Sequence, residues 1–214
     1  YTNSFTGTDL IWTPDSMLWP DIGKWSATID NVSLPTNMAD ENQYSTLRYF
    51  PTTTNSSSSS SSKALNQSKF CYTLPATAGN YYLIRASFWY GLPSMIYELY
   101  KNNRIRFHVI VDNYEGVEIV IDIPQSYPWF EEMYIRAQSS FVSVCLSAAS
   151  DTSDVPFINS LELRPLATTM HPVELISNTN QAMRTVFQGD SGTMSNDPPI
   201  LRSVLLLLEI LRIE

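Results

Sequence analysis

The sequence predicts an all-β protein whose strands form an antiparallel jelly-roll β-sandwich. Three observations lead to this fold class. Short β-rich runs fill the chain, Pro, Gly, Asn and Asp separate them, and helical periodicity is nearly absent before residue 200. The runs recur at a spacing of roughly ten residues, without intervening helices that could join parallel strands. A chain of 214 residues suits one such domain, or one domain and part of a second.

The expected strands are runs rich in β-branched and aromatic residues. Alternation is clearest in the run YYLIRASFWY, where the even-numbered residues of 82–88 form one set and the odd-numbered residues of 83–89 the other. Successive side chains of a strand point to opposite faces, so one of these sets should face the core. In chain order, the expected strands are 9–12, 45–50, 70–74, 81–90, 95–100, 105–111, 117–123, 130–137, 141–147 and 157–164.

Some segments depart from this pattern. The serine run 56–62 has low complexity and is expected to be a flexible loop between strands. The composition changes after residue 165, and we expect a sandwich lobe over residues 1–170, then a linker and the truncated start of a second lobe over residues 171–214. The apolar run 201–213 is shorter than the roughly 20 residues that cross a bilayer, so it predicts a short amphipathic helix. The chain begins at Tyr1 without a signal peptide, which predicts a fragment or a processed product.

Charge and cysteine content limit the partners and the compartment. A net charge of −8 argues against nucleic acid or an anionic membrane as the main partner, because both require a basic patch. Only 16% of the residues are charged while Ser, Thr and Asn are plentiful, a balance that resembles secreted β proteins. Cys71 and Cys145 each lie in an expected strand and are compatible with one disulfide or with two buried free thiols.

The sequence does not predict an enzyme or a bound cofactor. It contains no G-x-S-x-G, P-loop, G-x-G-x-x-G or H-E-x-x-H motif. His108 is expected to be a strand residue, and two isolated histidines with two separated cysteines form no zinc pattern. Glu131 and Glu132 are adjacent, so in a strand they should point to opposite faces. A glycosidase stays open only if two buried carboxylates face each other in a cleft.

A binding role is what the aromatic and polar content favours. Aromatic residues make up 12% of the chain, and flat rings beside polar side chains suit the C–H faces of sugars. The same residues are enriched at protein interfaces, so composition alone leaves both kinds of ligand open. Three Asn-X-Ser sequons permit glycosylation, and they lie at Asn31, Asn55 and Asn66.

Five strings occur in an order and spacing that resemble one family. They are TDLIWTPD (8–15), TLRYFP (46–51), CYTLPATAGNYYLIRASFWYG (71–91), VSVCLS (142–147) and PFINSLELRPL (156–166). Together they are similar to the malectin-like domain of plant receptor-like kinases, in particular of the type with leucine-rich repeats. The resemblance implies an extracellular, non-catalytic jelly-roll module, attached to the plasma membrane through parts of the receptor that are absent from this chain.

The resemblance also implies a ligand and candidate residues. It implies binding of carbohydrate, such as a cell-wall oligosaccharide or a glycoprotein glycan, and alternatively of a peptide or a co-receptor ectodomain. By position, Tyr49, Trp89 and Tyr90 are similar to aromatic residues that hold a sugar in animal malectin. Both cysteines fall in strands that family members mark with cysteine, which implies a Cys71–Cys145 bridge.

Overall fold

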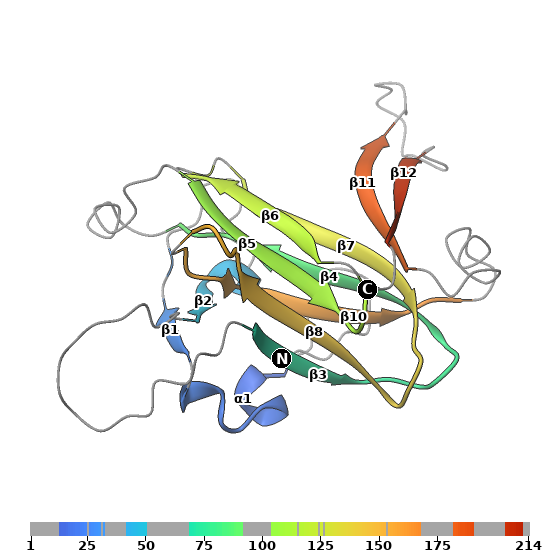
Figure 1. Cartoon of the computed structure of the whole chain (residues 1–214), viewed down its shortest axis with the longest axis horizontal. Helices are drawn as coiled ribbons and strands as arrows, with labels where there is room; N and C mark the ends of the chain where they lie inside the picture. The colour runs from blue at the N-terminus through green and yellow to red at the C-terminus, as the bar shows by residue number, and fades with distance from the viewer. Residues whose placement is uncertain are drawn as a thin grey trace, which may run out of the picture.

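The computed structural model describes residues 13–24, 26–30, 32, 42–50, 69–91, 104–114, 116–123, 125, 127–152, 154–167, 182–190 and 204–211. Most of them form antiparallel β-strands, which confirms the predicted all-β sandwich (Figure 1). The strands are β1 (Ala27–Asp30), β2 (Thr46–Tyr49), β3 (Lys69–Pro75), β4 (Tyr81–Phe88), β5 (Arg104–Val111), β6 (Val117–Asp122), β7 (Trp129–Arg136), β8 (Phe141–Ala148), β9 (Phe157–Ile158), β10 (Ser160–Pro165), β11 (Ala182–Asp190) and β12 (Val204–Leu211). The helical turns are α1 (Asp15–Leu18), η2 (Ile22–Lys24) and η4 (Asn42–Tyr44).

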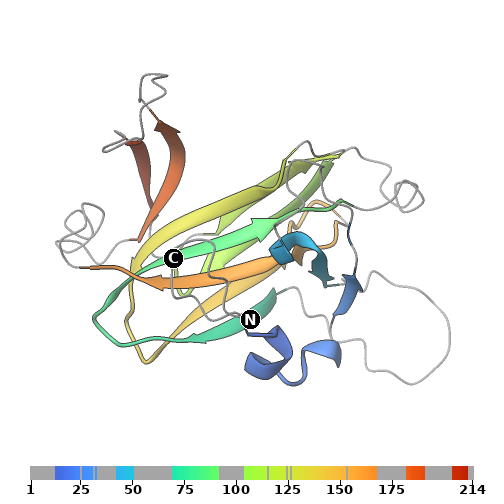
Figure 2. The ribbon, with the colours of Figure 1, turned by 180° about the vertical axis from the view of Figure 1, so that it is seen from behind.

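The strands form two main sheets and one small sheet. One main sheet has the order β3-β8-β5-β6, and the other has the order β10-β4-β7-β11-β12. The small sheet, β1-β2-β9, lies at one end of the sandwich beside α1 (Figures 1 and 2). Because β9 is followed by β10 after a single residue, the chain passes from the small sheet into a main sheet at Asn159.

Strand alternation builds the core between the main sheets. In β4 the even-numbered residues 82–88 are buried, and Ile84, Ala86 and Phe88 are fully covered. In β5 and β6 alternate residues are buried in the same way. Aromatic rings fill the centre, where Phe107 lies 5.3 Å from Phe88 and 5.6 Å from Phe157 between ring centroids. The period of two that the sequence shows is therefore the arrangement that buries the apolar set.

The two cysteines form the disulfide that the family resemblance implies. Cys71 of β3 and Cys145 of β8 are directly opposite each other in the antiparallel ladder and are bonded. The bridge therefore joins neighbouring strands of one sheet.

The C-terminal segment differs from its prediction. Residues 204–211 form strand β12, so the expected short helix was wrong. A short apolar run fits a strand or a buried helix equally well by periodicity, and here pairing with β11 decides in favour of the strand. Strand β11 also pairs with β7 at residues 183–184, and the β11–β12 ribbon projects from the sandwich (Figure 2).

Several sequence-based expectations fall outside the described residues. These are the strands expected at 9–12 and 95–100, the serine run 56–62, and the sequons at Asn31, Asn55 and Asn66. The short turn α1, which was not expected, follows Pro14 and carries Asp15 in its first turn. The start of a helix tolerates proline well, and the helix dipole favours an acidic residue there.

Candidate functional site

A groove lies where the edges of the two main sheets meet the small sheet and α1. We call it the edge groove. Strands β3 and β10 are the edge strands of their sheets on this side, and α1, η4 and the small sheet supply the rest of the lining. Its volume is about 290 Å³. The apolar part of the lining consists of Leu18, Leu74, Ile158 and Leu161.

Strand β2 brings a positive charge into the groove because its side chains alternate. Leu47 and Tyr49 face the core, whereas Thr46 and Arg48 line the groove. Arg48 donates from Nε and Nη2 to the carboxylate of Asp15, with 2.8 Å from Nη2 to Oδ1. Its Nη1 donates to Ser26 Oγ at 3.0 Å. The bidentate contact with Asp15 fixes the guanidinium plane of Arg48 against α1.

The same pair sets the protonation states in the groove. Burial lowers the pKa of Arg48, but the hydrogen bond and the negative charge of Asp15 outweigh it and raise the pKa overall. The hydroxyl of Tyr72 lies 3.5 Å from Asp15 Oδ2. Burial, followed by the charge of Asp15, raises the pKa of Tyr72 well above its usual range. The groove therefore holds a charged arginine and a neutral phenol.

Asn159, at the junction of β9 and β10, fixes the wall of the groove. Its Oδ1 accepts a hydrogen bond from the backbone N–H of Trp89 at 2.6 Å. Its Nδ2 donates to the carbonyl oxygens of Tyr44 and Thr46 at 3.4 and 3.1 Å. One amide side chain thus joins the end of β4 to the start of β2.

Ser160 lines the groove next to Asn159 and has an unusual property. Among the described residues, Ser160 and Ser87 carry the two buried hydroxyl oxygens that make no hydrogen bond. They are directly opposite each other in the β10–β4 ladder, and the residues are 8% and 1% exposed. Buried polar atoms normally have a partner, so an unpaired one requires an explanation. Of the two serines, Ser160 is the one in the lining of the groove.

None of the three predicted aromatic residues lines the groove, and two of them, Tyr49 and Tyr90, lie beside Phe157. Tyr49 is opposite Phe157 in the β2–β9 ladder, and the ring of Tyr90 lies 5.3 Å from that of Phe157. Trp89 and Tyr90 are each 5% exposed. Stacking on a sugar requires an open ring face, so these two rings offer little surface in this conformation.

Sequence reasoning missed a separate set of exposed aromatic residues. Tyr127, Trp129 and Phe130 are 67%, 46% and 45% exposed, and Arg85 lies 5.0 Å from the ring centroid of Phe130. It also missed the pairing of Asp15 with Arg48. Both residues lie in strings that carry the family resemblance, TDLIWTPD and TLRYFP, which was the available signal.

The carboxylates of the sandwich form ion pairs with arginines. Glu131 accepts from Arg184 Nε at 2.5 Å, and Glu132 accepts from Arg85 Nε at 2.7 Å. In the β4–β7 ladder Glu131 is opposite Ala86, on the core face of β4, and Glu132 is opposite Arg85, on its other face, so the two point to opposite faces as expected. Within the described ranges, no group of three or more His, Cys, Asp or Glu side chains is placed to hold a metal ion. No helix in that part of the chain is both long and apolar enough to cross a membrane.

Comparison with protein families decides the relationship. The model of the malectin-like domain matches residues 1–200. The chain belongs to the malectin-like domain family. The malectin-like domain is 32% identical over 149 residues to a protein of Arabidopsis thaliana named a probable leucine-rich-repeat receptor-like serine/threonine-protein kinase. A second such kinase of the same plant, also named as probable, is 29% identical over 167 residues.

The match covers only part of each relative. It spans 67% of this chain but 14% of the first kinase, and 78% of this chain but 16% of the second. The matched region is the ectodomain, which is separate from the catalytic kinase domain of these relatives. The malectin-like domain is therefore an extracellular module.

Solved structures agree in fold. The plant receptor-like kinase FER has a TM-score of 0.52 at 18% identity, covering 76% of this chain and 39% of that chain. The extracellular domain of ANXUR1 from Arabidopsis thaliana has a TM-score of 0.51 at 13% identity, covering 84% and 45% respectively. At these identities the likeness shows the fold alone.

Proposed function

We propose that this malectin-like domain is the ligand-recognition part of a cell-surface receptor of the receptor-like kinase type, and that it binds carbohydrate from the cell wall or from glycoproteins. The domain itself catalyses no reaction. Attachment to the plasma membrane and kinase activity would belong to other parts of the receptor.

The edge groove is the observation that carries this proposal. It combines an apolar wall with a charged pair, Arg48 and Asp15, and with the polar residues Thr28, Gln43 and Thr46. Ligand sites commonly have this composition, an apolar lining with a few fixed polar groups that orient the ligand. Sugars offer both kinds of surface, C–H faces and hydroxyl groups.

Titration of the purified chain with oligosaccharides tests the proposal. Isothermal titration with gluco-, galacto- and pectic oligosaccharides should give saturable binding by at least one class, with a dissociation constant below about 1 mM. The same chain unfolded in denaturant is the control for non-specific heat. If no oligosaccharide binds with a dissociation constant below about 1 mM, carbohydrate recognition is not the function.

A second candidate function is binding of a peptide or a co-receptor ectodomain. The exposed residues Tyr127, Trp129 and Phe130 favour it, because aromatic residues with a neighbouring arginine are typical of protein interfaces. Trp129→Ala separates the two candidates. It should abolish capture of a protein partner if this surface is the interface, and it should leave oligosaccharide binding in the edge groove unchanged.

A further inference from the structure

Strand β12 is the edge strand of a main sheet, and its sequence lacks the features that usually protect such an edge. The backbone groups of an edge strand can pair with another chain, so proteins commonly place charged residues or proline there. The other edge strands of the two main sheets follow this rule. They carry Lys69 and Pro75 in β3, Glu118 and Asp122 in β6, and Glu162, Arg164 and Pro165 in β10. Strand β12 reads VLLLLEIL, without proline or a basic residue, and its one charged residue is Glu209.

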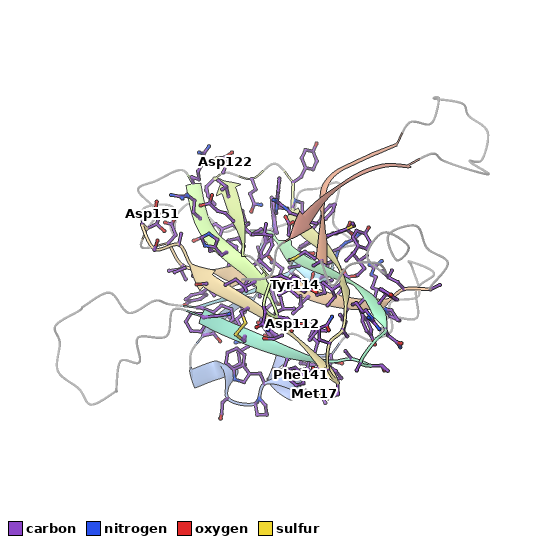
Figure 3. The ribbon with its side chains drawn as sticks, turned by 45° about the vertical axis from the view of Figure 1, so that its right-hand side comes forward. Met17, Asp112, Tyr114, Asp122, Phe141 and Asp151 are labelled. Carbon is purple, nitrogen blue, oxygen red and sulfur yellow. A yellow bond between two sulfur atoms is a disulfide. The ribbon has the colours of Figure 1, made fainter. Side chains whose placement is uncertain are left out.

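The composition of β12 is typical of a strand with neighbours on all sides. Apart from Glu209, apolar residues occupy both its even- and its odd-numbered positions, a pattern found in strands buried on both faces. Among the described strands, however, β12 pairs with β11 alone, and β11 pairs with β7 only at residues 183–184. The β11–β12 ribbon therefore projects from the sandwich (Figures 1, 2 and 3). A two-stranded ribbon is marginally stable by itself, and a further strand beside β12 would stabilise it.

A second copy of β12 fits this edge because the segment is complementary to itself in an antiparallel pair. About a two-fold axis, each contact between identical strands occurs twice. Arg202, which lies outside the described residues, precedes Glu209 by seven positions. A register that places Arg202 opposite Glu209 therefore forms two Arg–Glu pairs, and it places the apolar residues 204–207 opposite each other. A register centred on Glu209 would instead set two carboxylates against each other, which is destabilising.

From these observations we propose that the chain forms a symmetric dimer in which β12 pairs antiparallel with β12 of a second copy, with Arg202 of each chain opposite Glu209 of the other. The edge groove stays free in this dimer, because β10 lines the groove and β12 is at the opposite edge of the same sheet. The dimer thus carries two ligand-recognition sites on the far sides of one continuous sheet.

The dimer should be reversible and should not grow further. Its contact is one strand from each chain, which buries less than the roughly 1,600 Å² of a standard interface. We therefore expect a dissociation constant of about 1–100 μM. Once two copies of β12 are paired, this edge is used in both chains, so the assembly stops at two.

Sedimentation velocity of the full chain tests the proposal. Concentrations from about 1 to 200 μM span the expected dissociation constant. A salt concentration of about 0.15 M screens the repulsion between two chains that each carry a charge of −8. The average mass should rise with concentration from that of one chain towards that of two chains, and no further.

Leu206→Lys and Gln188→Lys form a matched pair of variants. The two residues are opposite each other in the β11–β12 ladder, and of these two strands only β12 is at the edge of the sheet. Leu206→Lys should weaken the dimer at least about tenfold, because it introduces a charge twice at the apolar centre of the contact. Gln188→Lys should leave the dissociation constant nearly unchanged. In dilute protein both variants should keep the melting temperature of the sandwich, because the ribbon pairs with β7 at residues 183–184 only.

The register is tested with the two arginines that flank β12. Arg202→Glu places two carboxylates opposite each other at both ends of the contact and should weaken the dimer roughly tenfold. Arg212→Glu makes the same change in net charge on the other side of β12. In the proposed register its position is opposite Pro199 and not opposite Glu209, so its effect should be smaller.

The contrary results are distinct from those of the proposed function. A chain that stays monomeric at every concentration would overturn the dimer, and protection of the β12 amides from hydrogen exchange in that monomer would show that the same chain covers the edge. Species larger than two chains would indicate open-ended strand addition and overturn the symmetric pair. Equal weakening within either pair of variants would overturn the proposed contact. Oligosaccharide titrations decide none of these points, so the dimer and the proposed function can fail separately.

Discussion

Asn159 shows how much of this structure depends on single polar side chains. It accepts from the backbone of Trp89 and donates to the carbonyl oxygens of Tyr44 and Thr46. Gln125 plays a similar role for Tyr90, the residue after Trp89: its Oε1 accepts a hydrogen bond from the backbone N–H of Tyr90 at 2.7 Å. These amides hold the end of β4 in place beside the small sheet.

Replacing Asn159 should therefore destabilise the protein. Asn159→Ala removes the three hydrogen bonds of this side chain, and a typical intramolecular hydrogen bond contributes about 0.5–1.5 kcal/mol to stability. Urea unfolding followed by tryptophan fluorescence measures the change. Asn80→Ala, at an exposed turn position, is the control and should have little effect. If Asn159→Ala lowers the free energy of unfolding no more than Asn80→Ala does, the stabilising role of Asn159 is contradicted.

Asp112 is a residue whose charge opposes folding. It lies on the turn after β5 near Tyr114, with a φ of 48°, and its Oδ1 accepts from the backbone N–H of Ser143 at 2.7 Å (Figure 3). Burial raises the pKa of Asp112, although the Ser143 hydrogen bond opposes the shift. Because the pKa is raised in the folded state, this carboxyl favours folding below its ordinary pKa of about 3.9, and that contribution is lost as the pH rises through the folded value.

Asp112→Asn should consequently remove the free-energy cost of burying the charged Asp112 carboxylate, a cost that depends on pH. Asparagine also tolerates a positive φ, and its amide oxygen can accept the same hydrogen bond. We expect variant and wild type to have equal stability near pH 3, and the variant to gain relative to the wild type as the pH rises above about 4. Urea unfolding across this range provides the measurement. A wild type that gains stability relative to the variant with rising pH would disprove the assigned direction.

At the scale of elements, the disulfide joins β3, an edge strand that lines the edge groove, to β8. The two cysteines are 74 residues apart, and closing a loop of this length restricts the unfolded chain by about 4 kcal/mol in the chain-entropy account. The bridge thus favours a folded state in which β3 stays in register.

The double variant Cys71→Ala, Cys145→Ala should lower the free energy of unfolding by about 2–4 kcal/mol. Hydrogen exchange should rise first in β3, because this strand has one neighbour in its sheet and β8 has two. Wild type in reducing buffer is the companion measurement and should resemble the variant. Unchanged protection of β3 in both samples would refute a stabilising role for the bridge.

At the scale of the whole molecule, β11 extends a main sheet beyond the predicted lobe of residues 1–170. It pairs with β7 at residues 183–184, Ala182 belongs to the core cluster, and Arg184 bonds to the buried Glu131. A buried charge that loses its partner costs about 3–5 kcal/mol. The boundary at residue 170 stays a prediction, and these contacts make it testable.

Two truncated chains provide the test. A chain ending at residue 190 keeps the Glu131–Arg184 pair and should unfold at nearly the temperature of the full chain. A chain ending at residue 167 loses this partner and should be less stable by several kcal/mol. Calorimetry compares the two. Equal melting temperatures would show that the sandwich is complete without β11 and would support the boundary at 170.

The fold class and most strands of this malectin-like domain follow from its sequence, because the period of two in runs such as 81–90 reflects which side chains must be buried. The sequence also placed both cysteines in strands. Its signal was ambiguous at 204–211, where a short apolar run allows helix or strand until a neighbouring strand is present. Tertiary structure alone decided the edge groove. Asp15, Arg48, Tyr72 and Ser160 are separated by up to 145 positions in the chain and come together only when the edges of the sheets meet. Local periodicity encodes which face of a strand is buried, but the pairing of distant side chains depends on long-range contacts that no local pattern contains.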